Sequence, residues 1–443
     1  MDKPNVFRTS EFYMSEGDTL HVSIKYEDGS DVVLLDLVAG DSGTTVRATP
    51  YVFTLTSTGD GSGVSTLTMQ SNADVTLTLD GTARFYSDAA GTLDEATTWL
   101  LTSGADRTIY IKCPSGTATL SVPDNVITRW TAWTSYGNAA SISGNLGLFS
   151  ALTYVEVFGN NTLSGNIALL TGLTHISLGG LNTLTGVVTS LTSLNYLNIT
   201  GNTTLSGDIS GLTLLTFLWV GGTTTITGSI TNLTLLEYLY MIGTNTLSGD
   251  VTLLTSLRWI EVDGANTITG SVTSLTLLTT LWAFGTNTLS GSIDALLSLD
   301  VVAVQGNNTI SGDISLHPPL TWLEVRGNNT LSGDIAGLTS LTYFDVWGNN
   351  TVTFSNVTNL PSLSYLYVHT SVTLLSANVN QLLADMWLNR DEVKGNAFRI
   401  IDLQGNVASG GPTGQGIVDK AALEAYRSWG NNPAYDLWTV TTR

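Results

Sequence analysis

The sequence repeats itself every 21 residues over more than half of its length. A Ser/Thr-Gly pair keeps this step from Gly144 to Gly333, and a second glycine keeps it from Gly159 to Gly348. Glycine fixed at one point of every copy indicates a turn with positive φ or a contact too close for a side chain. A unit of this size cannot enclose a hydrophobic core alone, so each copy must be covered by the next one.

The apolar residues follow the same period. One column runs from Val155 to Phe344, and a second, two residues further on, runs from Val157 to Val346. This alternation is typical of a short strand with one buried face. The repeat therefore predicts a parallel-stranded solenoid over residues 137–376, with strands stacked about 4.8 Å apart.

The unit reads L-x-x-L-x-L-x-G-x-N-T-[LI]-[ST]-G-x-[IV]-x-x-L and resembles the leucine-rich repeat family. Its Leu-Ser-Gly-Asp-Ile segment is similar to the L-x-G-x-I piece of plant-type members, and the resemblance covers about Gly144–Leu403. The asparagine, first seen as Asn161, stands one residue later than is usual in the family, and Thr203 and Thr224 replace it in two copies. The resemblance implies a ladder of asparagines that hydrogen-bonds neighbouring coils.

The first third of the chain lacks the repeat. Its alternating runs with Asp-Gly between them predict hairpins at 19–37 and 75–86. We expect an N-terminal β segment at 1–50, suited to docking, and a β-sandwich-like domain at 51–136. Further strands are expected at 65–69, 98–101, 108–112 and 117–122.

The end of the chain also departs from the repeat. Apolar residues have helical spacing at 377–388 and 418–429, and strand patterns occupy 398–403 and 436–441. A solenoid needs an atypical terminal unit to shield its open core. The sequence thus predicts a mainly β protein: a parallel-stranded leucine-rich-repeat solenoid, preceded by a β-sandwich-like N-terminal region and closed by a small α/β C-terminal cap at 377–443.

Composition excludes several classes of function. Lys plus Arg number 16 against 36 Asp plus Glu, a net charge of −20, which makes nucleic acid a poor partner. Hydrophobic residues reach 42% and charged ones only 12%, which excludes a disordered chain. No apolar run approaches the ~20 residues of a membrane span, and the start of the sequence lacks the apolar core of a Sec signal peptide. No motif indicates a cofactor or a metal site.

The expected outer face of the strands is rich in aromatic side chains. If the columns of Val155 and Val157 point inward, the residues that alternate with them face solvent. Fifteen of these 33 positions are aromatic, against 8% of the whole chain. Exposed aromatic surface on this scale usually marks a binding site, and Trp and Tyr combine a flat apolar face with a polar handle. The candidate ligand-binding residues, called the aromatic strip, are Trp219, Tyr238, Tyr240, Trp259, Glu261, Asp263, Trp282, Phe284, Trp322, Glu324, Arg326, Tyr343, Asp345 and Trp347.

Two other interpretations of the strip stay open. The rings could simply stack along the sheet, where cross-strand aromatic pairs contribute ~0.2–1 kcal/mol each. Carboxylate pairs such as Glu324 with Asp345 could serve glycoside hydrolysis. Arg326 offers either carboxylate an ordinary ion-pair partner, so we expect no enzyme.

The order of modules also looks like that of bacteriophage fibre or decoration proteins and of bacterial surface proteins with leucine-rich repeats. The segments Leu77–Pro114 and Leu403–Thr442 carry this resemblance. It implies a virion or extracellular surface location, with the N-terminal region docked on other virion proteins. The first hypothesis is a non-enzymatic recognition module for a host surface glycan or protein receptor. The second is a purely structural virion component whose solenoid contacts neighbouring subunits, including a homo-oligomer.

Overall fold

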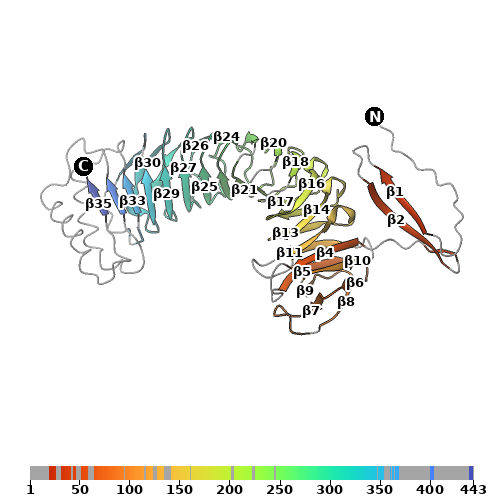
Figure 1. The fold of residues 1–443 in the computed structure, drawn as a ribbon. Coiled ribbons are helices and arrows are strands. Elements are labelled where there is room, and N and C mark those ends of the chain that lie inside the picture. Colours follow the sequence, from red (N-terminus) through yellow and green to blue (C-terminus); the bar gives the residue numbers. More distant parts are fainter. Residues whose placement is uncertain are drawn as a thin grey trace, which may run out of the picture. The chain divides into compact units, whose positions relative to one another are not determined.

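The computed structural model shows an almost entirely β fold in the residues that it describes (Figure 1). It describes residues 19–25, 31–40, 43–45, 51–57, 64–93, 95–113, 116–122, 127–133, 141–159, 161–200, 204–221, 225–243, 246–346, 348–353, 360, 362–363, 365–368, 400–403 and 439–442. Within these ranges the only helices are three-residue 3-10 turns. No helix of the described part has the length and hydropathy to cross a bilayer.

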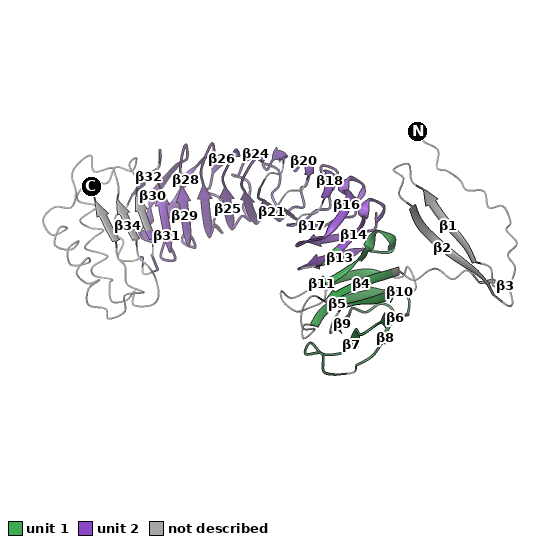
Figure 2. Cartoon of the chain, in the orientation of Figure 1, with its two compact units in different colours: residues 1–152, 160–162 green, residues 153–159, 163–443 purple. Residues whose placement is uncertain are grey.

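The chain divides into two compact units (Figure 2). Unit 1 comprises residues 1–152 and 160–162, and unit 2 comprises residues 153–159 and 163–443. The domain boundaries expected near 50, 136 and 376 stay predictions.

Unit 1 begins with the hairpin expected at 19–37. Strand β1 (Thr19–Lys25) pairs antiparallel with β2 (Asp31–Gly40), which also pairs with β3 (Gly43–Thr45). This hairpin is confirmed.

The rest of unit 1 forms two antiparallel sheets. The first has the order β12-β4-β10-β6-β8 and the second joins β11, β5, β9 and β7. The strands of the first are β4 (Tyr51–Ser57), β6 (Val75–Asp80), β8 (Thr98–Leu101), β10 (Gly116–Val122) and β12 (Ser141–Asn145). Those of the second are β5 (Val64–Ser71), β7 (Arg84–Tyr86), β9 (Arg107–Lys112) and β11 (Ile127–Trp133).

The hairpin predicted at 75–86 is wrong. Strand β6 pairs with β8 and β10, whereas β7 pairs with β9 in the other sheet. The Asp-Gly turn is present, with Gly81 at φ 76°, but it carries the chain from one sheet to the other. Leu79 and Phe85, on the two sides of the turn, are both buried, so the crossing lets both strands contribute to the same core.

Aromatic packing joins the two sheets of unit 1. The rings of Phe53 on β4 and Trp130 on β11 have centroids 4.4 Å apart, and both lie near the ring of Phe149. All three side chains are fully buried. Burial of large aromatic side chains contributes strongly to the stability of a small core.

Unit 2 is a solenoid whose strands form two parallel sheets, one on each side of every coil (Figure 1). The front sheet contains β13 (Tyr154–Phe158), β15 (His175–Leu178), β17 (Tyr196–Ile199), β19 (Phe217–Val220), β21 (Tyr238–Met241), β23 (Trp259–Val262), β25 (Thr280–Ala283), β27 (Val301–Val304), β29 (Trp322–Val325), β31 (Tyr343–Val346), β33 (Tyr365–Val368), β34 (Ile400–Leu403) and β35 (Thr439–Thr442).

The back sheet contains one short strand per coil. These strands are β14 (Thr162–Asn166), β16 (Thr183–Val187), β18 (Thr204–Asp208), β20 (Thr225–Ser229), β22 (Thr246–Asp250), β24 (Thr267–Ser271), β26 (Thr288–Ser292), β28 (Thr309–Asp313), β30 (Thr330–Asp334) and β32 (Thr351–Thr353). Four 3-10 turns follow back-sheet strands: η2 (Ile167–Leu169), η3 (Val188–Ser190), η4 (Ile314–Leu316) and η5 (Ile335–Gly337). A fifth, η1 (Leu146–Leu148), follows β12 in unit 1.

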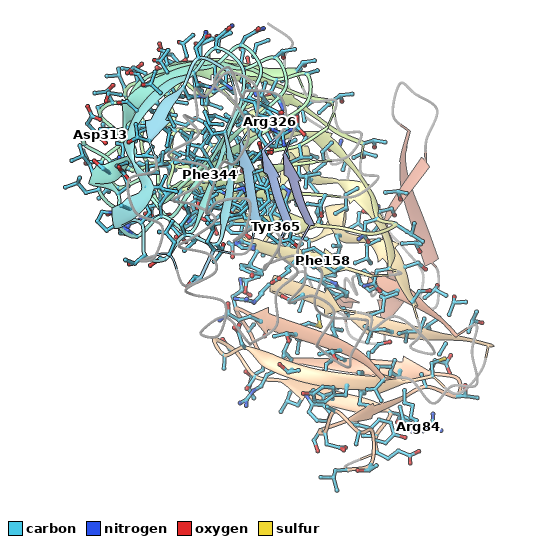
Figure 3. The ribbon with its side chains drawn as sticks, turned by 90° about the vertical axis from the view of Figure 1, so that its left-hand side faces the viewer. Arg84, Phe158, Asp313, Arg326, Phe344 and Tyr365 are labelled. Atoms are coloured by element: carbon cyan, nitrogen blue, oxygen red, sulfur yellow. The ribbon has the colours of Figure 1, made fainter. Side chains whose placement is uncertain are left out.

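The predicted apolar columns fill the interior of the coil. From Val155 and Val157 through to Phe344 and Val346, every member is at most 1% exposed. Figure 3 shows Phe344 inside the coil, between Asp313 on the outer side of the back sheet and Arg326 on the side of the front sheet. The predicted register of the strands is therefore confirmed.

The implied asparagine ladder is present. Asn308, which is fully buried, accepts a hydrogen bond from the Leu289 N–H at 2.8 Å. Its amide donates to the carbonyls of Ala283 (2.9 Å) and Gln305 (2.7 Å). Equivalent bonds to the preceding coil are made by Asn161, Asn182, Asn287, Asn329 and Asn350.

One glycine column is explained by close contact between coils. Gly306 has φ 82°, and a Cβ placed on it would lie 2.8 Å from the carbonyl oxygen of Gly285 in the coil below. A side chain at this point would therefore prevent the coils from approaching to strand distance.

Most of the predicted C-terminal cap lies outside the described residues. This holds for both predicted helices, 377–388 and 418–429. Strands β34 and β35 lie close to the predicted strands at 398–403 and 436–441, and they extend the front sheet in parallel after β33.

Candidate functional site

The candidate site is the outer face of the front sheet. Its rings alternate with the buried columns, and none of the described ones is tucked inside the coil. Among the members of the strip, Glu324 and Asp345 are buried, Trp347 lies outside the described residues, and the others are half-buried.

The first coils carry a continuous stack of rings. Tyr154 stacks on His175 with centroids 3.9 Å apart, His175 on Tyr196 at 4.1 Å, and Tyr196 on Phe217 at 4.2 Å. Parallel pairing with an offset of 21 residues places these side chains directly beside one another. The count of aromatic residues missed His175, although its place in the column of Tyr154 could have revealed it.

The middle of the strip combines rings with a carboxylate. Trp219 stacks on Tyr240 at 4.9 Å, and Tyr240 contacts Trp259 at 5.6 Å. The Trp259 Nε1–H donates to the Glu261 carboxylate at 3.2 Å. Burial and the nearby charge of Glu261 raise the pKa of Tyr240 to about 12, so its phenol stays neutral.

The ladder of rings is interrupted after β23. Thr280 and Val301 occupy the next two places of the column. Trp282 bridges this interruption: its ring lies 5.2 Å from Phe284 and 6.3 Å from Trp322, two strands away. Stacking then resumes between Trp322 and Tyr343, whose centroids are 3.8 Å apart.

An ion triad lies beside this second stack. Arg326 Nη2 is 3.1 Å from the Glu324 carboxylate and 2.6 Å from that of Asp345. Although both acids sit on the outer face of the sheet, Glu324 is 8% and Asp345 3% exposed. Burial raises the pKa of Glu324; the Arg326 guanidinium opposes this, and the Asp345 charge adds to it.

The structure thus divides the strip into groups with different surroundings. Glu261 lies against Trp259, while Glu324, Arg326 and Asp345 form one cluster. Asp263 accepts a hydrogen bond from the Gly264 N–H at 2.6 Å, so its carboxylate stabilises a turn. No group of three or more His, Cys, Asp or Glu side chains in the described ranges could hold a metal ion.

No protein-family model matches this sequence, and no curated protein matches it either. Solved structures with a similar fold include PEPR1-AtPEP1 (19% identity, 60% of this chain and 40% of that chain, TM-score 0.44). They also include the leucine-rich-repeat ectodomain of the plant membrane receptor kinase GASSHO1/SCHENGEN3 from Arabidopsis thaliana in complex with CASPARIAN STRIP INTEGRITY FACTOR 2 (21% identity, 53% of this chain and 35% of that chain, TM-score 0.38). A third is the functional domain of InlJ from Listeria monocytogenes (20% identity, 53% of this chain and 62% of that chain, TM-score 0.32).

These likenesses concern the fold, and the chain spans less than half the length of the first two proteins. The fold of the repeat region is assigned from the features of its own coils. The 21-residue period, the buried leucine columns and the asparagine ladder give the repeat region of this chain a solenoid fold similar to that of leucine-rich repeats.

Proposed function

We propose that this protein is a non-enzymatic recognition module that binds a surface glycan or protein receptor through the aromatic strip. Its place would be a bacteriophage particle, as a fibre or decoration protein, or a cell surface, with the N-terminal region as the attachment. The observation that carries the proposal is the half-exposed row of rings on the outer face of a rigid sheet. Large aromatic side chains presented on a fixed scaffold bind partners at a low cost in conformational entropy.

Stacking alone does not account for the strip. Rings beside one another on adjacent strands stabilise a sheet, and the Tyr154–Phe217 part of the ladder fits that role. Trp282 does not, because it leaves the column and reaches across strand β27 to Trp322 on β29. Buried carboxylates beside these indoles also contribute little to the stability of a sheet, since removing a charge from water is costly.

The geometry of the acids supports a binding surface more than a hydrolytic site. Glu324 and Asp345 share one nitrogen of Arg326. A general acid and a nucleophile need separate environments that set their pKa values apart, and a common guanidinium ties these two carboxylates together.

The test is a double variant, Trp259→Ala with Trp282→Ala. The purified chain is first screened on arrays of cell-surface polysaccharides and surface proteins, and the captured ligand is then offered to the variant. We expect loss of retention with an unchanged circular dichroism spectrum. The matched control is Trp99→Ala, which removes a half-buried indole from β8 in unit 1. Equal retention by the double variant and the parent chain would refute the proposal.

The structural alternative makes a different prediction. A coat component whose strip contacts a neighbouring subunit would form an obligate oligomer in solution. Light scattering on the parent chain and on the double variant separates the two cases. If both are monomers, ligand recognition is supported; if the parent chain is an oligomer and the double variant is a monomer, assembly is supported.

A further inference from the structure

The outer face of the front sheet carries an excess of negative charge. Its central column contains Glu156, Glu261, Glu324 and Asp345 and no basic residue. Arg326, which directly follows β29, borders the column as the cation of the ion triad. Because charges on such a face select partners of opposite sign, a cationic ligand is favoured here over a neutral or an acidic one.

The charges of the ion triad do not balance. It sets two carboxylates against one guanidinium, which leaves one negative charge over when both acids are ionised. Asp345 Oδ1 is buried without a hydrogen-bond partner, on a residue that is 3% exposed. Buried acceptors are normally satisfied, and no described group of the chain donates a hydrogen bond to this oxygen.

The spacing of the acids defines the form of the ligand. Glu261 and Glu324 lie on β23 and β29, three strand spacings apart in the same column, or about 14 Å. An extended peptide covers this distance in about four residues, and its side chains at the first, third and fifth positions point to the same side. The positions between the two acids are Trp282 and Ala303, which offer the third side chain an apolar surface.

We propose that the aromatic strip binds an extended cationic protein segment that crosses the strands, with two lysine or arginine side chains four residues apart at Glu261 and Glu324 and an apolar side chain between them at Trp282. This rests on the proposed function and names its ligand. The indoles of Trp259 and Trp322 lie two residues before the two acids on the same strands, where an open ring face adds cation–π attraction. The leftover charge of the triad acts on the second cation without direct contact to Asp345.

Protonation of Glu324 supplies an independent signature. Burial raises the pKa of this carboxyl in the empty site, and a cation bound beside it favours the ionised form. Affinity therefore falls as the pH is lowered towards the range in which Glu324 is protonated. Arg326, Asp345 and Glu324 are the charged groups that share this environment, and Arg326 stays protonated throughout.

The test uses the full chain and a short synthetic peptide with two lysines four residues apart and leucine midway, measured by titration calorimetry over a series of pH values. We expect binding that weakens as the pH is lowered, and about tenfold weaker binding when the lysines are three residues apart and point to opposite sides. Glu261→Gln and Glu324→Gln should each weaken binding about tenfold. The control Asp250→Asn makes the same charge change on the back sheet and should leave affinity unchanged.

The outcomes separate the two proposals. No binding of the basic peptide, together with strip-dependent binding of another ligand, overturns the cationic segment and leaves the recognition function standing. No strip-dependent ligand of any kind overturns both. Equal binding of the peptides with the original and the altered spacing, together with a loss of affinity in Asp250→Asn as large as that in Glu261→Gln, would show attraction by net charge alone and would also overturn the inference. Because Glu261 is half-buried and outside the triad, its variant keeps the test valid if Glu324→Gln fails to fold.

Discussion

The asparagine ladder allows a prediction whose magnitude follows from the structure. In Asn308→Ala, the N–H of Leu289 loses its acceptor and the carbonyl of Gln305 loses a donor, both inside the coil. The Ala283 carbonyl keeps a second donor, the Gln305 N–H at 3.1 Å. One buried donor left unpaired costs about 1–3 kcal/mol, and each lost bond about 1 kcal/mol. We therefore expect the unfolding free energy to fall by about 3–5 kcal/mol.

Amide hydrogen exchange is the appropriate assay, because a long repeat array need not unfold in one cooperative step. Exchange at Leu289 should accelerate in Asn308→Ala together with that of its coil, while the urea midpoint falls. The control is Asn307→Ala, the exposed neighbour in the same loop, which should change stability by less than about 0.5 kcal/mol. Equal exchange at Leu289 in the parent and in Asn308→Ala would show that the ladder does not hold the coils together.

Two further predictions concern the coils of unit 2. Gly306→Ala places a Cβ against the carbonyl of Gly285 at a positive φ and should lower the unfolding free energy by about 1–3 kcal/mol, whereas Gly211→Ala, with no atom within 4 Å of the new Cβ, should be nearly neutral by urea denaturation. His317 is fully buried at a place that leucine fills in other coils, and burial lowers its pKa. The unfolded chain therefore binds a proton at this imidazole more readily than the folded chain does. The unfolding free energy should have its full value above pH ~6.5 and fall below that pH. His317→Leu should remove that acid-side loss, and parallel pH profiles of the urea midpoint for both proteins would contradict it.

The register of the solenoid could be predicted from the sequence because two periods agree. The 21-residue step fixes which residues stack, and the alternation at Val155 and Val157 fixes which face is buried. A shift by one residue would expose every aliphatic column at once. The asparagine ladder follows from the same constraint, since its buried position repeats with the coil.

Pairing between strands of unit 1 could not be predicted in the same way. The Asp-Gly signal after Leu79 is local and correctly marks a turn with positive φ. Which sheet the next strand joins depends on β9 and β10, whose residues lie far along the chain. Local turn chemistry carries no information on that choice, and for this reason the hairpin prediction at 75–86 was wrong.

The conformations of individual rings could not be predicted from the sequence either. The columns placed Trp282 and Trp322 on the same face, but nothing in the repeat indicates that the first reaches over Ala303 towards the second. That reach depends on the small side chains between them. The ion triad was predicted as an ordinary surface pair, whereas the structure buries both of its acids.

The stacking geometry limits which ligands could fit the outer face of the front sheet. Where rings lie 3.8–4.2 Å apart and nearly parallel, as from Tyr154 to Phe217, each face is covered by its neighbour and only ring edges meet the solvent. Sugars that bind aromatic side chains use the faces, so the first coils are poorly suited to them. Edges carry the positive part of the ring quadrupole and attract acceptors such as peptide carbonyls. After Trp259 the ladder is interrupted, and acids stand beside the indoles. A ligand that offers backbone carbonyls along its length and cations at fixed intervals satisfies both parts of this surface, and an extended protein segment has that chemistry.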